Sequence, residues 1–493
     1  MQRRFLKNLV FLLVLNLLIK PFWLLGIDRT VQNTVGAGEY GFYFAVFNFS
    51  FLFNILLDLG ITNFNNRNIA QNNHLLNKHL SKIIVLKLLL FLLYIIFTFG
   101  GAFIIDYSRE QIMLLIFLGI NQFLLSFILY FRSNFGGLHM FVTDSIMSVL
   151  DRTLMIIICA VLLWGNVVGE FKIQYFVYAQ TTAYGLTALT GLSILLKKAQ
   201  VRIFKINWNW PFFLMIIKKS FPFAVLVLLM TFYNRIDSVM LERLLPNGAR
   251  YSGIYASAYR LLDAANMFAL LFSVLLLPIF ARMIKQKQPI EELAKLSYTL
   301  IITPAIIVAA GAFHYSSEIM ELLYSRHVDE TAVEFAFRIE SSSKVFSLLM
   351  CCFVAISSTY VFGTLMTANG NLKHLNIIAF GGMILNISLN LWLIPILQAY
   401  GSAISSLLTQ FLVASLQILL VKKIFNLKIN YLLISKLVIF ILGMIIINQL
   451  SYLLPFVWYI NFLIMVATGV LLSFIIKLIS VRNIIKILKY EDH

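Results

Sequence analysis

The sequence FPFAVLVLLMTFYNRIDSVMLERLL, residues 221–245, is an apolar segment with charged residues at its centre. A helix rises about 1.5 Å per residue, so this segment is long enough to cross a bilayer core of roughly 30 Å. Its middle carries Arg235 and Asp237, and an ionised side chain at that depth costs roughly 2.5–3.5 kcal/mol on insertion scales. Membrane proteins keep such residues where they line a wet cavity, pair with each other or bind a charged ligand. The segment therefore points to a working site.

The rest of the chain has the composition of a membrane protein. Of its 493 residues, 60% are hydrophobic and only 12% are charged. A soluble domain of this size cannot bury so much apolar surface, so most of the chain must face lipid. We predict an all-α polytopic membrane protein with about 14 transmembrane helices. The approximate spans are residues 7–27, 40–62, 83–105, 112–131, 145–165, 173–196, 214–245, 253–281, 293–314, 335–362, 373–397, 399–421, 431–450 and 455–477.

The formal net charge of +18 does not indicate nucleic-acid binding, because of where the positive charges lie. With the N-terminus placed inside, about 25 of the 39 Lys and Arg residues fall in or beside cytoplasmic loops. The longest outside link, near residues 315–334, is acidic instead. This distribution predicts membrane topology and contact with anionic lipids. An even number of spans places both termini in the cytoplasm.

Cysteines and histidines give no sign of a metal site. The three cysteines, Cys159, Cys351 and Cys352, lie inside predicted spans and read as small buried hydrophobic residues. The seven histidines have no metal-ligand spacing. We therefore expect neither a metal nor another cofactor.

A basic link near residues 197–213 divides the chain into two similar halves. The segment Gly41–Phe47 opens the second span, and Gly253–Tyr259 opens the eighth, each after an outside loop. Equivalent segments six spans apart predict two six-helix lobes, and transporters built in this way commonly bind their substrate between the lobes. The predicted domains are an N-terminal lobe (1–200), a C-terminal lobe (201–425), and spans 13 and 14 with a basic cytoplasmic tail (426–493).

Several short segments share their order and spacing with one known family. They are Val35–Gly41, Leu57–Ile61, Asn66–Ala70, Tyr233–Asp237, Gly253–Arg260, Leu389–Pro395 and Tyr400–Ala403. Together they resemble the signatures of the polysaccharide-biosynthesis flippases, the O-antigen-type lipid-linked oligosaccharide exporters of the multidrug/oligosaccharidyl-lipid/polysaccharide (MOP) superfamily. The resemblance covers nearly the whole chain.

This resemblance implies a MATE-like, two-lobed helical bundle. Such a protein would move an undecaprenyl-pyrophosphate-linked oligosaccharide across the cytoplasmic (inner) membrane by alternating access, for lipopolysaccharide or other surface polysaccharide synthesis. We expect a monomeric transporter and not an enzyme. The alternatives are another MOP exporter, either a peptidoglycan-precursor flippase or a cation-coupled multidrug exporter, and a membrane glycosyltransferase or polymerase.

Three cations at similar depth are the predicted substrate-binding groups. Lys20, Arg235 and Arg260 lie mid-membrane to slightly outward when their positions are counted from the helix ends. The repeat makes their helices counterparts, and their side chains suit a pyrophosphate. The alternative for Arg260 is an intrahelical pair with Asp263, three residues on. The alternative for Lys20 is snorkelling or local distortion of the helix, because Pro21 follows and is expected to break the helix.

Two carboxylates and two tyrosines complete the predicted site. Asp237 and Asp263 are coupling-ion candidates, with charge balance for the arginines as the alternative. Asp237 is not a same-face partner of Arg235, because helical residues two apart point to different faces. Tyr255 and Tyr259 lie beside these charges and are candidate sugar-binding aromatics, with core packing or lipid contact as the alternative.

Other charged residues within the spans read as structural. Asp151 and Arg152 are adjacent in the inner third of span 5. Glu340 and Lys344 are four residues apart and can pair on one helix face. Asp58, at the cytoplasmic end of span 2, reads as a turn or lobe-interface residue.

Overall fold

A computed structural model describes residues 15–16, 18–62, 65–66, 69, 72, 75–199, 208–427 and 430–479. Within these residues the chain is mostly helical and contains no strand. Within these residues, ten helices are long and apolar enough to cross a membrane. Every predicted span from the third to the fourteenth coincides with a described helix. The all-α prediction is therefore confirmed. The start of span 1, residues 67, 68 and 70 of the family-like motif, and the basic tail after residue 479 lie outside the described residues.

Contacts divide the chain into two compact units, each treated by itself below. Unit 1 comprises Met1–Arg243 and Asn247–Gly253, and unit 2 comprises Leu244–Pro246 and Ile254–His493. The helix that carries Arg235, α8 (Trp210–Leu244), thus groups with the N-terminal helices. The division into two six-helix lobes stays a prediction.

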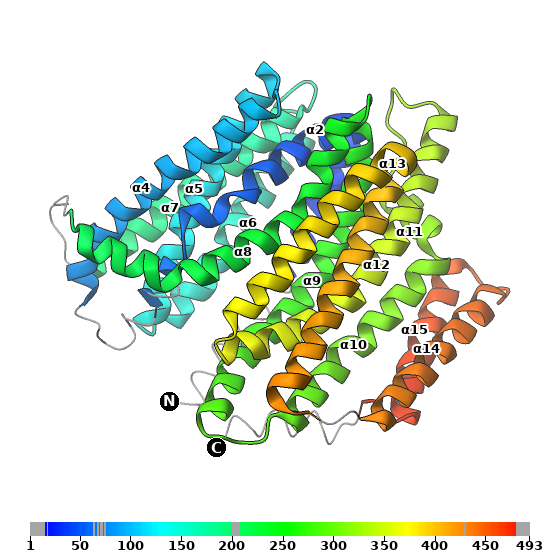
Figure 1. The fold of residues 1–493 in the computed structure, drawn as a ribbon. Coiled ribbons are helices and arrows are strands. Elements are labelled where there is room, and N and C mark those ends of the chain that lie inside the picture. Colours follow the sequence, from blue (N-terminus) through cyan, green and yellow to red (C-terminus); the bar gives the residue numbers. More distant parts are fainter. Residues whose placement is uncertain are drawn as a thin grey trace. The chain divides into compact units, whose positions relative to one another are not determined.

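Unit 1 begins with a helical segment that runs through Pro21. A π-helix, η1 (Trp23–Asp28), joins it to α2 (Arg29–Leu52), and backbone angles are helical at Phe22 and at Arg29. The expected break at Pro21 is therefore wrong, but the expected local distortion is present as the π-helical turn, which re-satisfies backbone groups near the proline. The chain turns instead at Gly36, whose φ of 79° favours glycine. The other elements are η2 (Asn54–Leu57), α4 (Leu75–Ile104), α5 (Arg109–Gly137), α6 (Phe141–Trp164), α7 (Ile173–Ala199) and α8 (Figure 1).

Hydrogen bonds between buried polar side chains join the helices of unit 1. Gln180 of α7 donates to the Tyr43 hydroxyl of α2 at 2.8 Å. Asn48 of α2 donates to Ser238 of α8, also at 2.8 Å. In membranes such bonds and close packing hold helices together, because lipid removes the hydrophobic drive for helices to associate. They therefore fix α2, α7 and α8 within one unit.

Glycines bring α2 against the start of α9 (Gly248–Lys285). A Cβ at Gly41 would overlap the carbonyl oxygen of Ala249, and a Cβ at Gly253 would overlap that of Ala37. Gln32 donates to the carbonyl of Gly253 at 3.1 Å across the same crossing. Helix α2 therefore packs directly on the first turn of α9, and only glycine permits so close an approach.

Unit 2 is formed by the rest of α9 and the helices that follow it. The two spans predicted at 373–397 and 399–421 form one helical element with a non-helical residue, Gln398, at the predicted junction (φ 54°, ψ −132°). Pro395 lies within the same kinked stretch. The elements are α10 (Glu291–His314), α11 (Ser316–Leu323), α12 (Ala332–Ala368), α13 (Leu372–Phe425), α14 (Tyr431–Tyr452) and α15 (Trp458–Ile475).

Matching N-terminal caps begin one long helix in each unit. Ser108 accepts a hydrogen bond from the Gln111 backbone, and the Gln111 side chain accepts one from the Ser108 backbone. Thr331 and Glu334 form the same reciprocal pair at the start of α12. Each box satisfies backbone donors that a helix otherwise leaves without a partner.

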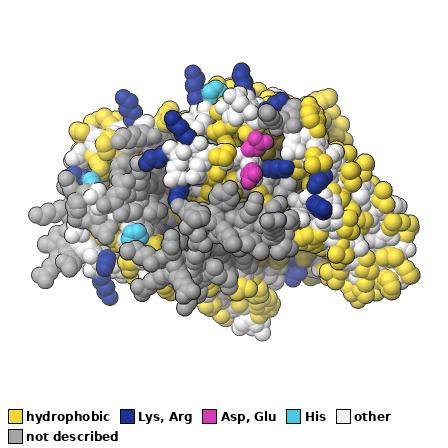
Figure 2. All heavy atoms as spheres, turned by 90° about the horizontal axis from the view of Figure 1, so that it is seen from below, with side chains coloured by type: hydrophobic (Ala, Val, Ile, Leu, Met, Phe, Trp, Pro, Cys, Tyr) yellow, Lys and Arg dark blue, Asp and Glu magenta, His cyan; other side chains and the backbone are white. Residues whose placement is uncertain are grey.

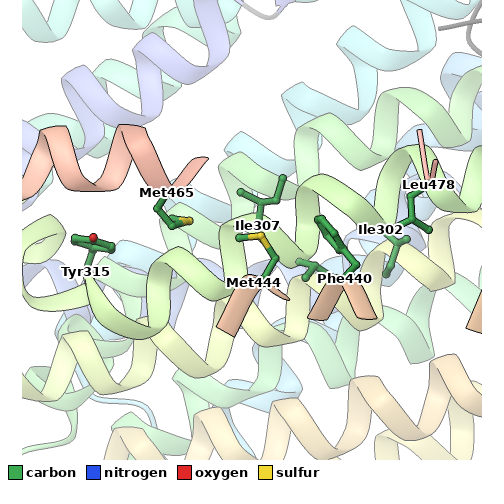
Figure 3. Close-up of a cluster of buried hydrophobic side chains, with 8 residues drawn as sticks. Ile302, Ile307, Tyr315, Phe440, Met444, Met465 and Leu478 are labelled. Atoms are coloured by element: carbon green, nitrogen blue, oxygen red, sulfur yellow. The ribbon is translucent and has the colours of Figure 1, made fainter. Parts of the chain in front are cut away.

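The last two helices pack on α10 through a buried apolar cluster. Ile302 and Ile307 of α10 meet Phe440 and Met444 of α14 and Met465 of α15 (Figure 3). Close packing of these buried side chains favours one fixed arrangement of the three helices. Spans 13 and 14 are thus an integral part of unit 2.

Polar contacts hold the same helices together at one end of α10. Asn448 donates to the carbonyl of Ala310 at 2.7 Å, and His314 lies 2.8 Å from the Gln449 side-chain oxygen. The Tyr315 hydroxyl lies 2.7 Å from that of Ser451. These bonds fix the register between α10 and α14, because each requires one residue opposite another.

Basic residues mark one end of several helices. Figure 2 views the lower end of the helices of Figure 1 and shows scattered Lys and Arg side chains with few acidic ones. This is the pattern expected of a cytoplasmic face. The basic pairs in the last turns of α7, α9 and α13 are Lys197 and Lys198, Arg282 and Lys285, and Lys422 and Lys423.

Candidate functional site

The charged residues of α8 occupy two environments. The Arg235 guanidinium lies 5.4 Å from the centre of the Phe51 ring of α2. Asp237 is only 1% exposed, and the next residue, Ser238, accepts the hydrogen bond from Asn48. Residues two apart on a helix point in different directions. Arg235 therefore lies at an aromatic surface of α2, whereas Asp237 lies in the buried interior.

Lys20 lies in a group of charged residues contributed by three helical segments of unit 1. Asn16, four residues before Lys20, bonds to Ser148 of α6 at 2.9 Å, and the ring of Trp23, three residues after it, lies 5.6 Å from the Arg152 guanidinium. Lys20 therefore lies on the helix face directed at α6, near the charges of Arg152, Arg132 and Asp151. Arg132 of α5 pairs with Asp144 of α6 at 2.7 Å, and Arg152 lies 3.7 Å from Asp151. We call these five residues the inner charge cluster. Its three cations and two carboxylates leave one net positive charge.

Aromatic side chains surround Arg152 within this cluster. Its guanidinium lies 5.6 Å from the Trp23 ring and 5.7 Å from the Tyr184 ring. It also donates a 3.0 Å hydrogen bond to the Tyr184 hydroxyl. Trp23 is in turn stacked on Phe176 at 5.7 Å. Cation–π contacts of this kind hold an arginine in place without neutralising its charge.

Sequence reasoning missed the partners of Lys20. Arg132 was not singled out, and Arg152 was read as structural with Asp151. Helix α5 ends at Gly137 and α6 begins at Phe141, so only a short link separates the two helices. Arg132 near the end of α5 and Arg152 in α6 therefore belong to neighbouring helices. An arginine near the end of one span and another inside the next was the only available signal.

Arg260 and the two tyrosines lie in unit 2, on α9. Arg260 forms the predicted alternative pair, with its Nη1 3.7 Å from Asp263 Oδ2. The rings of Tyr255 and Tyr259 are stacked at 5.5 Å and are 1% and 6% exposed. These are the features of packed interior aromatics, which was the alternative interpretation. A single cavity shared by these residues and those of unit 1 stays a prediction.

A buried ion pair joins α4 to the turn after η2. Lys87 is only 1% exposed and donates to Asp58 at 3.0 Å, to the Leu57 carbonyl at 3.1 Å and to Ser126 at 2.6 Å. Asp58 also accepts from the Thr62 hydroxyl at 2.5 Å. The geometry supports the turn interpretation of Asp58. Lys87 was not predicted as its partner, because a lone lysine in an apolar span does not identify the residue it meets.

A second charged group lies at the C-terminal end of α8. Arg243 pairs with Glu242 at 2.8 Å, and Gln111 of α5 bonds to both of them. The Arg243 guanidinium also lies 4.7 Å from the Tyr107 ring. Burial, and next the charge of Glu242, raise the pKa of Tyr107 well above its usual range. This group fastens α8 to the α4–α5 loop and reads as structural.

In unit 2 the loop before α12 is held by a bidentate ion pair. Arg338 binds Glu330 through two bonds of 2.8 and 2.9 Å and donates to the Ser325 carbonyl at 2.9 Å. Glu340 and Lys344 form their predicted pair at 2.6 Å and are largely exposed. Among the described residues, no three His, Cys, Asp or Glu side chains come together as a metal site would require.

Comparison with known proteins places this arrangement in a family. Residues 5–284 match the family model described as polysaccharide biosynthesis protein. No curated protein matches the chain by sequence.

Solved transporter structures share the fold. The lipid II flippase MurJ in an inward closed conformation is 16% identical with a TM-score of 0.66, and the match covers 95% of this chain and 98% of that one. An inward-facing multidrug resistance MATE family transporter of the MOP superfamily is 14% identical with a TM-score of 0.60, covering 82% and 94%. A MOP superfamily transporter from Pyrococcus furiosus, reported to have a binding pocket of reverse polarity, is 14% identical with a TM-score of 0.58. That match covers 85% of this chain and 96% of the other. The MATE-like fold prediction is confirmed.

Proposed function

Because the chain belongs to the polysaccharide biosynthesis protein family, we propose that it is a flippase for a lipid-linked saccharide. The substrate is an oligosaccharide on undecaprenyl pyrophosphate, and the protein moves it across the cytoplasmic membrane by alternating access. The family match carries this proposal. A fold shared with MurJ and MATE transporters supports transport over enzyme chemistry.

The charges inside the helices support an anionic headgroup as cargo. Arg235 and the inner charge cluster lie on segments that are otherwise apolar. Charged groups at membrane depth are expensive, and a phosphate that they bind offsets that cost. A multidrug exporter with cationic cargo would be opposed by the same charges, which makes this alternative weaker.

A peptidoglycan-precursor flippase is the second candidate. It is favoured by the likeness to a lipid II flippase along 95% of the chain. Both candidates require the chain to handle a polyprenyl pyrophosphate, so they differ in the group attached to that pyrophosphate. An enzyme that transfers or polymerises sugars is the third candidate, and its activity would not need translocation.

One translocation assay separates these candidates. Cells lacking the protein are supplied with the wild-type gene or an empty vector, and lipid-linked oligosaccharide and lipid II are quantified in each leaflet. We expect lipid-linked oligosaccharide to accumulate in the inner leaflet without the protein and lipid II to stay unchanged. The opposite pattern would favour the second candidate, and unchanged distribution of both would refute the flippase proposal.

Topology and assembly are part of the same proposal. We place the chain in the inner membrane as a monomer with both termini in the cytoplasm. The basic residues that end α7, α9 and α13 support this orientation. Reporter fusions active only in the cytoplasm should be active at both ends. An inactive C-terminal fusion would contradict the even number of spans.

A further inference from the structure

The structure assigns a phosphate-binding subsite to Lys20 and Arg152, with Arg132 between this pair and the end of α5. Its ligand is the pyrophosphate group of an isoprenyl lipid. This inference rests on the proposed function and deepens it, because it adds Arg152 and Arg132, which sequence reasoning did not assign to the substrate, to the predicted binding residue Lys20.

Available hydrogen-bond donors point to a ligand at this place. Within the described residues, Lys20 forms no hydrogen bond and no ion pair. Arg152 uses Nη1 for the Tyr184 hydroxyl and the Met155 sulfur and holds Asp151 with Nε only at 3.7 Å. Its Nη2 makes no hydrogen bond to a described residue. The side chain of Arg152 is 26% exposed.

Charge within the cluster favours an added anion. Lys20 is subject to the charges of two arginines and of one carboxylate, that of Asp151. Asp144 is already engaged with Arg132 at 2.7 Å. A pyrophosphate bound by Lys20 and Arg152 would offset the repulsion between their like charges. Arginine can meet phosphate oxygens with two parallel N–H donors, while lysine acts as a point charge.

The three cations lie at different depths. Arg132 lies five residues before the end of α5, and Arg152 lies eleven residues after the start of α6. At about 1.5 Å per residue, these positions are roughly 9 Å apart along the helices. A headgroup that meets Arg132 first would therefore find Arg152 and Lys20 deeper in the same unit. We assign Arg132 to first contact and the other two to binding.

The aromatic side chains around Arg152 hold the subsite open. The Arg152 guanidinium lies over the rings of Trp23 and Tyr184, and within the described residues its Nη2 keeps no hydrogen-bond acceptor. Trp23 belongs to the π-helix η1, and π-helical turns occur frequently at functional sites. Asn16 donates to Ser148 at 2.9 Å and so joins the segment that carries Lys20 to α6. Both binding groups are thereby fixed relative to each other.

Binding to the purified full-length chain in nanodiscs of neutral lipid tests the assignment. The probes are geranylgeranyl pyrophosphate, geranylgeranyl monophosphate and, as a lipid headgroup, phosphatidylglycerol. We expect Lys20→Gln and Arg152→Gln each to weaken pyrophosphate binding at least about tenfold, which corresponds to about 1.4 kcal/mol. The combined variant should lose less than the product of the two single effects, because both groups act on one ligand.

Two further variants separate binding from a structural role. Asp151→Asn should strengthen pyrophosphate binding, because it removes a carboxylate that competes for Arg152. If Arg152 only stabilised the fold through that carboxylate, Asp151→Asn and Arg152→Gln would lower the melting temperature together and leave affinity unchanged. Lys344→Gln is the control, since it removes one positive charge from an exposed pair in unit 2.

The outcomes distinguish this inference from the proposed function. If the wild-type chain binds neither isoprenyl phosphate, the flippase proposal itself fails. If it binds pyrophosphate and the Lys20 and Arg152 variants bind equally well, only the subsite is refuted. Full competition by phosphatidylglycerol would also overturn the subsite, because the cluster would then bind membrane lipid. Should Arg152→Gln fail to fold, Arg152→Lys and Lys20→Gln carry the same test.

Discussion

Removing one partner of the buried Lys87–Asp58 pair should destabilise unit 1 strongly and unequally. The Lys87 side chain is 1% exposed and that of Asp58 is 22% exposed. Lys87 makes three hydrogen bonds, to Asp58, to the Leu57 carbonyl and to Ser126. Asp58 retains the Thr62 hydroxyl as a second partner. The lysine therefore depends on the pair more than the aspartate does.

The magnitudes follow from these environments. Asp58→Asn leaves a fully buried ammonium without its counter-charge, and breaking a buried pair in this way costs about 3–5 kcal/mol. Lys87→Met leaves a carboxylate that still has a hydroxyl donor and some solvent, so the cost should approach that of one charged hydrogen bond, about 1.5–3 kcal/mol. In the double variant no charge remains, and it should be more stable than Asp58→Asn alone.

Thermal unfolding of the purified proteins in one detergent measures these differences. One kcal/mol shifts the midpoint by about 2–4 °C in a domain of 150–250 residues, so Asp58→Asn should lower it by roughly 6–20 °C. Lys344→Met makes the same chemical change in an exposed pair and should cost less than about 1 kcal/mol.

The double-mutant cycle decides whether the reasoning holds. We expect a coupling free energy of about 1–3 kcal/mol between the two positions. Additive effects within about 0.5 kcal/mol would show that the 3.0 Å contact is not an energetic pair. A Lys87→Met protein as unstable as Asp58→Asn would refute the argument from unequal burial.

Three further predictions concern the site, the helix crossing and pH. Arg235→Ala should abolish polysaccharide export while membrane levels stay normal, and Arg235→Lys should retain part of it; export and membrane content are measured together, and normal export in Arg235→Ala would remove this residue from the site. Gly41→Ala places a methyl group against the Ala249 carbonyl and should lower the free energy of unfolding by about 1–3 kcal/mol. Gly38→Ala is the control, because a Cβ there meets open space and should not destabilise the protein. Equal melting temperatures of the two variants would contradict the close crossing of α2 and α9. Folding raises the pKa of Tyr107. The contribution of Tyr107 to stability is therefore complete below its unfolded pKa of about 10 and is lost as pH rises towards the folded value. A Tyr107→Phe protein should lack this loss of stability at alkaline pH, and identical pH profiles of the melting temperature in the two proteins would argue against this role of Tyr107.

Local sequence patterns predicted the features that depend on residues close in the chain. Apolar runs gave the helices, and the junction between the spans at 373–397 and 399–421 falls at Gln398, where the backbone leaves the helical region. The Arg260–Asp263 and Glu340–Lys344 pairs follow from spacing on one helix. Depth and periodicity determine these contacts, so a single sequence contains enough information for them.

Contacts between distant helices were beyond the same reasoning. Lys87 and Asp58 lie on different elements, and hydropathy treats the lysine only as a defect in an apolar run. Likewise the segment that carries Lys20 packs on α6, the helix that carries Arg152, and one sequence does not specify this packing. Pro21 misled because proline breaks an ideal helix, while a π-helical turn absorbs it here.

The attachment of α14 to α10 has a consequence for biosynthesis. Asn448 contacts His314, which the ribosome has made 134 residues earlier. At about 5–20 residues per second, this gap lasts roughly 7–27 s. During that time one flank of α10, including Ala310, and the adjoining Tyr315 must face lipid or another membrane protein in place of α14. Crosslinking of chains stalled before residue 431 and after residue 479 would show whether an insertion factor occupies this flank and leaves when the last two helices arrive.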